Sequence, residues 1–325
     1  MNRVLVCVIT GIILMVSPGC DLNDEDGEGV LIESSLVFTG IQQLIIDGIS
    51  GDCTIQPADD DTLRVDLSYT FPETCFEPSY LHDGDELELE ENFTGETCSG
   101  NAHWVITAPN GVDIEFESAS GSFSLTDHQG GVDVNSASGT IDLVEYTGQA
   151  DLNNASGNIT LETINAVINA SSASGHIYAS EATGDLDLSS ASGNVVVNNA
   201  SGKLNLSSAS GHVSCDAVVF TATSSLSSAS GNVGVVVAES PDYDLSLSSA
   251  SGDVVLNYNG NEVQGYFEFT ARQSDGTIIS PYPFDSETTF TQNEDIYMRK
   301  SFTRGQGTPR ITIGTSSGTA ELRLN

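Results

Sequence analysis

Residues 137–154 read Ala-Ser-Gly-Thr-Ile-Asp-Leu-Val-Glu-Tyr-Thr-Gly-Gln-Ala-Asp-Leu-Asn-Asn, and residues 155–157 start the same pattern again with Ala-Ser-Gly. The glycine of this triplet recurs along the chain, as Gly121, Gly139, Gly157, Gly175, Gly193, Gly211, Gly231 and Gly252. Its first five intervals are 18 residues long, and the last two are 20 and 21. A short, strict repeat of this kind predicts a solenoid in which each 18-residue unit forms one coil.

Apolar and polar residues alternate after each of these glycines, as in Ile141 and Leu143. A second glycine, such as Gly148, lies nine residues further on in several coils and starts a second alternating stretch. Alternation with a period of two is typical of a strand with one buried face. We therefore expect an all-β fold, a parallel β-solenoid (β-helix) with two strands per 18-residue coil and a core shared by two parallel sheets.

The Ala-Ser-Gly triplet falls between the two alternating stretches, so it is expected at a corner of the coil. The alanine is small enough to pack inside a tight corner, and the glycine is free to adopt the positive φ that a sharp turn requires. The two longer intervals place extra residues near 219–222 and 238–241. These are expected to be loop bulges at one end of the coil, and a ligand-binding rim is the alternative.

The first twenty residues have the layout of a signal peptide, with Arg3 followed by an apolar run over residues 4–16. Gly19-Cys20 is similar to the cleavage point of bacterial lipoproteins, so Cys20 is the expected lipidation site. The apolar run is shorter than the roughly 20 residues that a transmembrane helix needs. We therefore predict an exported lipoprotein of the bacterial cell envelope, with a signal peptide over 1–19, an acidic tether over 20–35, and contact with the membrane only through the lipid anchor.

The chain carries 46 acidic and 9 basic residues, for a formal net charge of -37. Lys203 is the only basic residue between Arg64 and Arg272. Nucleic acid is excluded as a partner, because its binding requires cationic groups that neutralise phosphates. The acidity favours a role in solubility, and collective binding of divalent cations is the alternative.

The regular repeats cover residues 118–259 and are flanked by less regular segments. Weaker alternation over 36–117 predicts irregular N-terminal coils that cap one end, and residues 260–325 are expected to form C-terminal coils and a cap. The β-solenoid domain is thus predicted to span 36–325. The ends of the solenoid are expected to be protected against stacking with a second copy.

The Ala-Ser-Gly ladder occurs together with Pro109-Asn-Gly-Val112 before it and Gly314-Thr-Ser-Ser-Gly318 after it. With these three features the chain resembles the bacterial putative adhesin family, β-solenoid domains often found in lipoproteins and envelope proteins. The resemblance covers roughly residues 36–325. No catalytic residues are implied by the resemblance.

Export favours oxidised cysteines, and Cys75 and Cys98 lie in the same irregular segment, so they are the expected disulfide. Cys53 and Cys215 are expected to be unpaired, with Cys215 at an inward-facing core position. The alternative is a zinc site that joins Cys75 and Cys98 to two histidines, His82 and His103. We predict no cofactor and no metal site. The sequence does not identify ligand-binding residues.

Three further motifs have structural explanations. Calcium binding by Asp59-Asp-Asp61 or Asp83-Gly-Asp85-Glu86 lacks a known calcium-loop pattern. Gly314–Gly318 has the form Gly-x-Ser-x-Gly, but no histidine follows His212, so a turn is expected. His176 and His212 are expected at outward ladder positions two coils apart.

The leading interpretation is a non-enzymatic envelope lipoprotein that presents a rigid acidic β-solenoid as an adhesin or surface scaffold. Its partner would be an envelope protein or a glycan. The alternative is a carbohydrate-binding or carbohydrate-cleaving β-helix protein. That alternative depends on four tyrosines expected to be exposed, which are Tyr146, Tyr178, Tyr243 and Tyr258.

Overall fold

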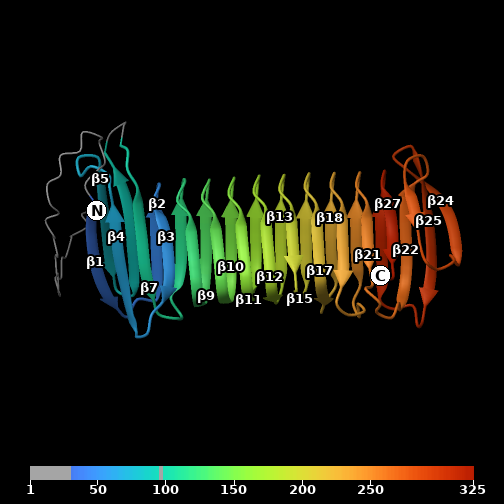
Figure 1. Ribbon diagram of the computed structural model, residues 1–325, viewed down its shortest axis with the longest axis horizontal. Helices are drawn as coiled ribbons and strands as arrows, with labels where there is room; N and C mark the ends of the chain where they lie inside the picture. The colour runs from blue at the N-terminus through green and yellow to red at the C-terminus, as the bar shows by residue number, and fades with distance from the viewer. Residues whose placement is uncertain (1–30, 95–97) are drawn as a thin grey trace.

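The computed structural model describes residues 31–94 and 98–325, which form 27 β-strands hydrogen-bonded into one continuous stack. The stack is a long, straight rod (Figure 1). In this described part of the chain, no helix is long and apolar enough to cross a membrane. The all-β solenoid expected from the repeat is confirmed. The predicted signal peptide, Cys20 and residues 20–30 of the predicted tether lie outside the described residues.

The regular coils stack in parallel with a register of 18 residues. Ile141, for example, pairs with Phe123 on one side and Ile159 on the other. In the first three of these coils both halves belong to one bent strand, and in the later coils the halves are separate strands. The strands are β9 (Phe123–Ser136), β10 (Ile141–Asn154), β11 (Ile159–Ser172), β12 (Ile177–Thr183), β13 (Leu186–Ser190), β14 (Val195–Asn198), β15 (Ser201–Gly202), β16 (Leu204–Ser208), β17 (Val213–Phe220), β18 (Ser224–Ser228), β19 (Val233–Val237), β20 (Leu245–Ser249) and β21 (Val254–Asn257).

The core is a set of columns of equivalent apolar residues, one from each coil. One such column contains Phe123, Ile141, Ile159 and Ile177, and each of these side chains is fully buried. Burial of one such side chain stabilises the fold by about 1.5–3 kcal/mol. Because each coil covers the core of the next, the rod is stabilised between coils and not within any single one.

At the N-terminal end the order of strands in space differs from their order in the sequence. The eight strands are β1 (Ile32–Thr39), β2 (Gln43–Gly48), β3 (Asp52–Pro57), β4 (Thr62–Tyr69), β5 (Phe76–Asp83), β6 (Glu86–Phe93), β7 (Ala102–Ala108) and β8 (Asp113–Ser118). The coil of β2 and β3 lies inside the rod, because β2 pairs with both β6 and β8, and β3 pairs with both β7 and β9. Antiparallel strands then cover the end, with β4 on β7, β1 on β4 and β5 on β6.

The C-terminal end repeats this arrangement in reverse chain order. Its strands are β22 (Gly265–Arg272), β23 (Thr277–Ile279), β24 (Ser286–Gln292), β25 (Asp295–Arg304), β26 (Arg310–Thr315) and β27 (Thr319–Arg323). The last coil, β26 and β27, lies between β20 and β21 on one side and β22 and β23 on the other. Antiparallel β25 and β24 form the outer layer on β22.

The alanines of the Ala-Ser-Gly corners are exposed, so the expectation that they pack inside the corner was wrong. The buried small residue is the one before the alanine, as Ser190 before Ala191 shows. Ser190 Oγ donates to Gly175 O at 2.9 Å in the preceding coil and accepts from Gly193 N at 2.8 Å. The same pair of bonds is made by Ser136, Asn154, Ser172, Ser208, Ser228, Ser249 and Thr315.

The glycines of these corners are required for space and not for a positive φ, which corrects the second expectation. None of the eight has a positive φ. A Cβ atom on Gly193 would lie 2.0 Å from Gly175 O, and the other seven show a similar conflict with the coil before them. The opposite corner holds the left-handed residue instead, with φ between 49° and 57° at Asp127, Glu145, Thr163, Glu181, Asn199 and Ala217.

Candidate functional site

One long face of the rod carries a row of stacked polar residues. Glu115, Asp133, Asp151, Asn169 and Asp187 occupy equivalent outward positions in five successive coils. Neighbours in such a row are about 4.8 Å apart, so their charges interact across the coils. Asn169 Nδ2 donates to Asp151 Oδ1 at 2.7 Å, which separates two carboxylates with an amide. We call these five residues the carboxylate row.

A shallow groove of about 310 Å³ lies beside the carboxylate row. It exists because Gly131, which has no side chain, comes between Asp113 and Gln149 in the adjacent column. Asp113 Oδ1 accepts a hydrogen bond from Gly131 N at 2.7 Å, so one of its oxygens is already used. Over residues 31–94 and 98–325, no three His, Cys, Asp or Glu side chains are placed to hold a metal ion. The face offers a series of hydrogen-bond acceptors.

The cysteines fall into a bonded pair and two buried thiols. Cys75 and Cys98 form a disulfide with an S–S distance of 2.09 Å, so they are not available as the zinc ligands of the alternative prediction. Cys53 and Cys215 are free and buried. Burial raises the pKa of both thiols, and at Cys53 the nearby Glu91 raises it further. Thiols held in the protonated form are poor nucleophiles, so these two act as core residues.

The acidic clusters considered for calcium are involved in local structure. Asp60 accepts from Thr62 N and from Arg64, each at 3.1 Å. The hydrogen bonds from Thr62 lower the pKa of Asp60, and Arg64 adds to this effect. The second cluster, Asp83 to Glu86, includes the turn between β5 and β6.

His176 and His212 lie at outward ladder positions, as expected, and they also fasten one coil to the next. His176 Nδ1 accepts from Asn194 N at 2.9 Å, and His212 Nδ1 accepts from Asn232 N at the same distance. Asn194 Oδ1 in turn accepts from His212 N at 2.8 Å. Each residue of this column therefore needs a side-chain acceptor, which explains why Asn, Asp and His alternate there.

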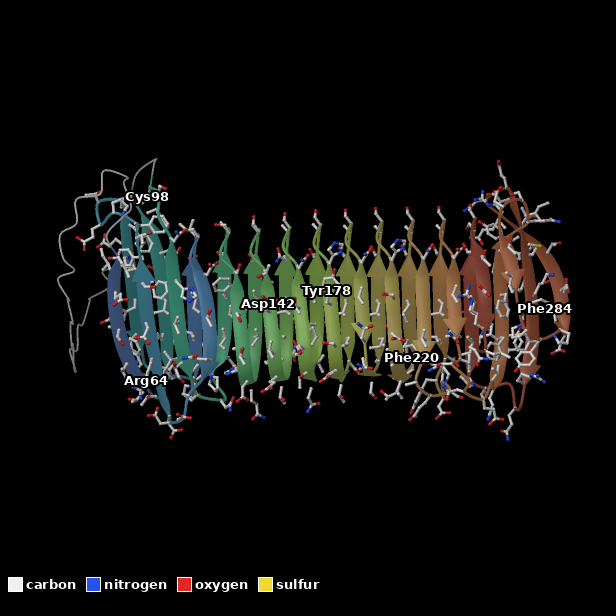
Figure 2. All side chains as sticks on the ribbon, in the orientation of Figure 1. Arg64, Cys98, Asp142, Tyr178, Phe220 and Phe284 are labelled. Atoms are coloured by element: carbon white, nitrogen blue, oxygen red, sulfur yellow. A yellow bond between two sulfur atoms is a disulfide. The ribbon has the colours of Figure 1, made fainter. Side chains whose placement is uncertain are left out.

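Two of the four tyrosines expected to be exposed are fully buried. Tyr146 and Tyr258 have no exposed surface, so that prediction was wrong for both. Tyr178 and Tyr243 are 40% and 47% exposed, and Tyr178 lies on an outer face of the regular coils (Figure 2). The Tyr146 hydroxyl is shared between the Gly130 and Gln149 carbonyls at 2.7 and 2.6 Å. Of the four tyrosines in the prediction, only Tyr178 and Tyr243 therefore lie on the surface.

Gly314–Gly318 forms the last corner of the ladder, as its turn prediction requires. Thr315 Oγ1 donates to Gly252 O at 2.8 Å and accepts from Gly318 N at 3.1 Å. Thr315 therefore takes the place of the serines in the regular corners. The segment is structural.

Sequence reasoning missed His128, which is buried in the second corner of its coil. His128 pairs with Tyr146 of the next coil, and His128 Nε2 donates to Val112 O at 2.8 Å. Burial lowers the pKa of His128, while the Val112 bond and nearby Asp113 and Asp127 oppose this shift. The 18-residue spacing could have indicated that His128 is buried. Two coils later, 36 positions along the chain, the same column contains the apolar residue Ile164.

Two solved structures and one family model are similar to this chain. A chain described as a putative cell adhesion protein from Clostridium sporogenes ATCC 15579 shares 10% identity, with 91% of this chain and 100% of that chain covered and a TM-score of 0.22. A putative adhesin from Parabacteroides distasonis ATCC 8503 shares 12% identity, with 90% and 98% covered and a TM-score of 0.33. The comparison with curated proteins gave no match. The family model described as Toastrack DUF4097 matches residues 41–278, and the chain therefore belongs to the Toastrack DUF4097 family.

Proposed function

We propose that this protein is a non-enzymatic, lipid-anchored adhesin-like rod of the bacterial cell envelope. The observation that carries this proposal is the unbroken stack of strands. One face runs from β5 through β6, β2, β8, the regular coils, β26, β22 and β25 to β24. At about 4.8 Å per strand the rod is roughly 65 Å long.

The rod is well suited to hold a binding surface in a fixed position. Its corners are tied between coils by side-chain hydrogen bonds such as that of Ser190 to Gly175 O. Its surface residues sit at fixed spacings on strands, so little conformational freedom is lost when a partner binds. A rigid surface of this kind supports adhesion or scaffolding.

The position of the N-terminus supports the anchoring part of the proposal. The described chain enters the rod at β1, one end of the stack, while β24 and β25 lie at the other end (Figure 1). A lipid on Cys20 would therefore hold the β1 end near the membrane. The β24 end would then lie farthest from the bilayer, where another surface can reach it.

The proposal is tested in the native host by deleting the gene and restoring it either as wild type or as Cys20→Ser. We expect deletion to reduce adhesion to host cells or to a matrix, wild type to restore it, and Cys20→Ser to be released without restoring it. Pull-down of the lipidated protein from its own envelope identifies the partner. Unchanged adhesion after deletion, or a specific hydrolase or lyase activity lost with one carboxylate, would overturn the proposal.

One observation supports the alternative function, carbohydrate binding. The burial of Tyr146 and Tyr258 removes half of the aromatic surface on which it depended. A large polar hollow at the C-terminal end of the rod, however, has the size and lining of a saccharide site. Carbohydrate binding is therefore proposed only for that hollow.

A further inference from the structure

A hollow of about 1060 Å³ lies at the end of the rod opposite β1. Five separate segments meet around it. They include the extra loop of the 21-residue repeat interval, through Asp242, and the turn after β25. Its polar lining includes Asp242, Glu262, Gln264, Tyr282, Arg304 and Gln306. A hollow of this volume accommodates a ligand of two sugar rings or more.

Arg304 gives this hollow a cationic group with which no carboxylate pairs in the described part of the chain. Six of the other cationic residues lie within 4.0 Å of a carboxylate oxygen, namely Arg64, Arg272, Arg299, Lys300, Arg310 and Arg323. Among residues 31–94 and 98–325, only Arg304 and Lys203 have no such partner, although the chain carries 46 acidic residues. Of these two, only Arg304 lines the hollow. Its charge is therefore free to bind an anion.

Tyr282 holds the Arg304 guanidinium in place. The guanidinium carbon lies 3.8 Å from the centre of the Tyr282 ring, and the ring itself packs on Phe302 at 5.5 Å. A guanidinium stacked by its face keeps its N–H groups free at the edge. That edge is suited to bind both oxygens of a carboxylate through two parallel hydrogen bonds.

The other groups in the hollow favour a ligand rich in hydroxyls. Asp242 and Glu262 are exposed carboxylates that accept hydrogen bonds from hydroxyls. Gln264 and Gln306 can both donate and accept, and buried Val263 adds apolar surface for the C–H groups of a sugar ring. The same carboxylates repel ligands with many negative charges, such as sulfated or phosphorylated polymers.

We propose that this hollow binds an acidic saccharide of the uronic acid class, with the ligand carboxylate on Arg304 and its hydroxyls on Asp242, Glu262 and the glutamines. The inference deepens the proposed adhesion function by naming the substrate class at the end of the rod. It does not depend on the lipid anchor. A peptide with a free C-terminal carboxylate would offer the same anion with fewer hydroxyls, and the test separates the two.

The test is calorimetric titration of the full chain in detergent with digalacturonate, diglucuronate, a neutral galactose disaccharide and a peptide with a free C-terminus. We expect at least one diuronate to bind, and the neutral disaccharide to bind at least tenfold more weakly. Arg304→Gln should weaken diuronate binding at least tenfold, since it removes a charge-assisted bidentate contact. Arg304→Lys should also lose most of the affinity, because an ammonium cannot form the paired contact.

Arg299→Gln is the matched control, because Arg299 lies on the same strand but pairs with Glu268 outside the hollow. It should leave diuronate binding unchanged, and both variants should melt cooperatively as the wild type does. The inference is overturned if no diuronate binds, if the neutral disaccharide binds equally well, if Arg304→Gln has no effect, or if only the peptide binds. If any of these results is obtained while deletion of the gene still reduces adhesion, the saccharide inference is wrong and the proposed adhesion function is retained.

Discussion

Trp104 Nε1 donates a hydrogen bond to Glu91 Oε1 at 3.0 Å inside the N-terminal end of the rod. Glu91 Oε2 accepts three more, from the backbone N–H groups of Ile49, Ser50 and Gly51. In the regular coils a serine hydroxyl fills this role, but here the equivalent residue is Gly48, which pairs with Ser118. The buried carboxylate of β6 thus replaces the missing serine of the neighbouring coil.

Removal of this carboxylate should destabilise the N-terminal end. Glu91→Ala leaves four donors without their partner, and we expect it to lower the free energy of unfolding by about 3 kcal/mol. Glu91→Gln keeps one acceptor oxygen and should lose less. Urea denaturation provides the measurement, with exposed Glu117→Ala as the control expected to stay within about 0.5 kcal/mol of wild type. Equal stability of Glu91→Ala and wild type would contradict the assigned role.

The corner glycines give a second prediction through a matched pair. A methyl group on Gly193 meets the Gly175 carbonyl of the adjacent coil, whereas nothing lies within 4 Å of the same methyl on Gly234. Gly193→Ala should cost about 3 kcal/mol or more, because the carbonyl belongs to backbone that is itself bonded on both sides. Gly234→Ala should be neutral or stabilising by up to about 1 kcal/mol. Thermal melts provide the measurement. Similar melting temperatures for the two variants would show that the close approach of Gly193 to the Gly175 carbonyl does not determine stability.

The two buried tyrosines should respond in opposite ways to loss of their hydroxyl. Tyr146→Phe removes a bond to two carbonyls and should destabilise by about 1 kcal/mol. The Tyr258 hydroxyl is buried and has no hydrogen-bond partner in the described structure. Tyr258→Phe should therefore be neutral or stabilising, because an unsatisfied polar group leaves the core. A loss of stability at Tyr258→Phe, measured by the same denaturation curves, would point to a partner for its hydroxyl.

His128 should make stability depend on pH below neutrality. Burial lowers the pKa of His128 in the folded state from an ordinary value of 6.5, so below pH 6.5 the unfolded chain binds the proton more readily. The stability due to neutral His128 is complete above pH 6.5 and is lost as the pH falls from there toward the folded pKa. His128→Gln, which does not titrate, should reduce the stability at pH 7.5. Its deficit relative to wild type should shrink at pH 5, and parallel pH profiles would refute this assignment.

The regular coils could be predicted from the sequence because their period links distant residues directly. A buried column such as Ile141, Ile159 and Ile177 follows from the 18-residue spacing and the two-residue alternation alone. The same spacing, applied to residues 128, 146 and 164, would have placed His128 and Tyr146 in the core. The exposed position predicted for Tyr146 was wrong because position in the repeat, and not aromatic type, determines which side chains face the core.

The corners and the ends could not be predicted, for two different physical reasons. The need for Gly193 comes from a carbonyl of another coil, so no local rule about φ detects it. The position of β2 and β3 inside the rod depends on which strands pair over long range, and weak alternation over 36–117 does not select those partners. The hollow around Arg304 likewise arises from segments that are far apart in the sequence.

The placement of β26 and β27 between β20 and β21 on one side and β22 and β23 on the other has a consequence for biosynthesis. A ribosome makes the capping strands β22 to β25 before it makes the coil on which they rest. Until residues 310–323 are translated, the cap has no surface to join and the last regular coil has an open edge. A chain that terminates early therefore cannot close its rod. In such a chain the strands β20 and β21 of the last regular coil stay unpaired on one side. Proteases and chaperones recognise unpaired edges of this kind, so they can distinguish incomplete copies from finished ones.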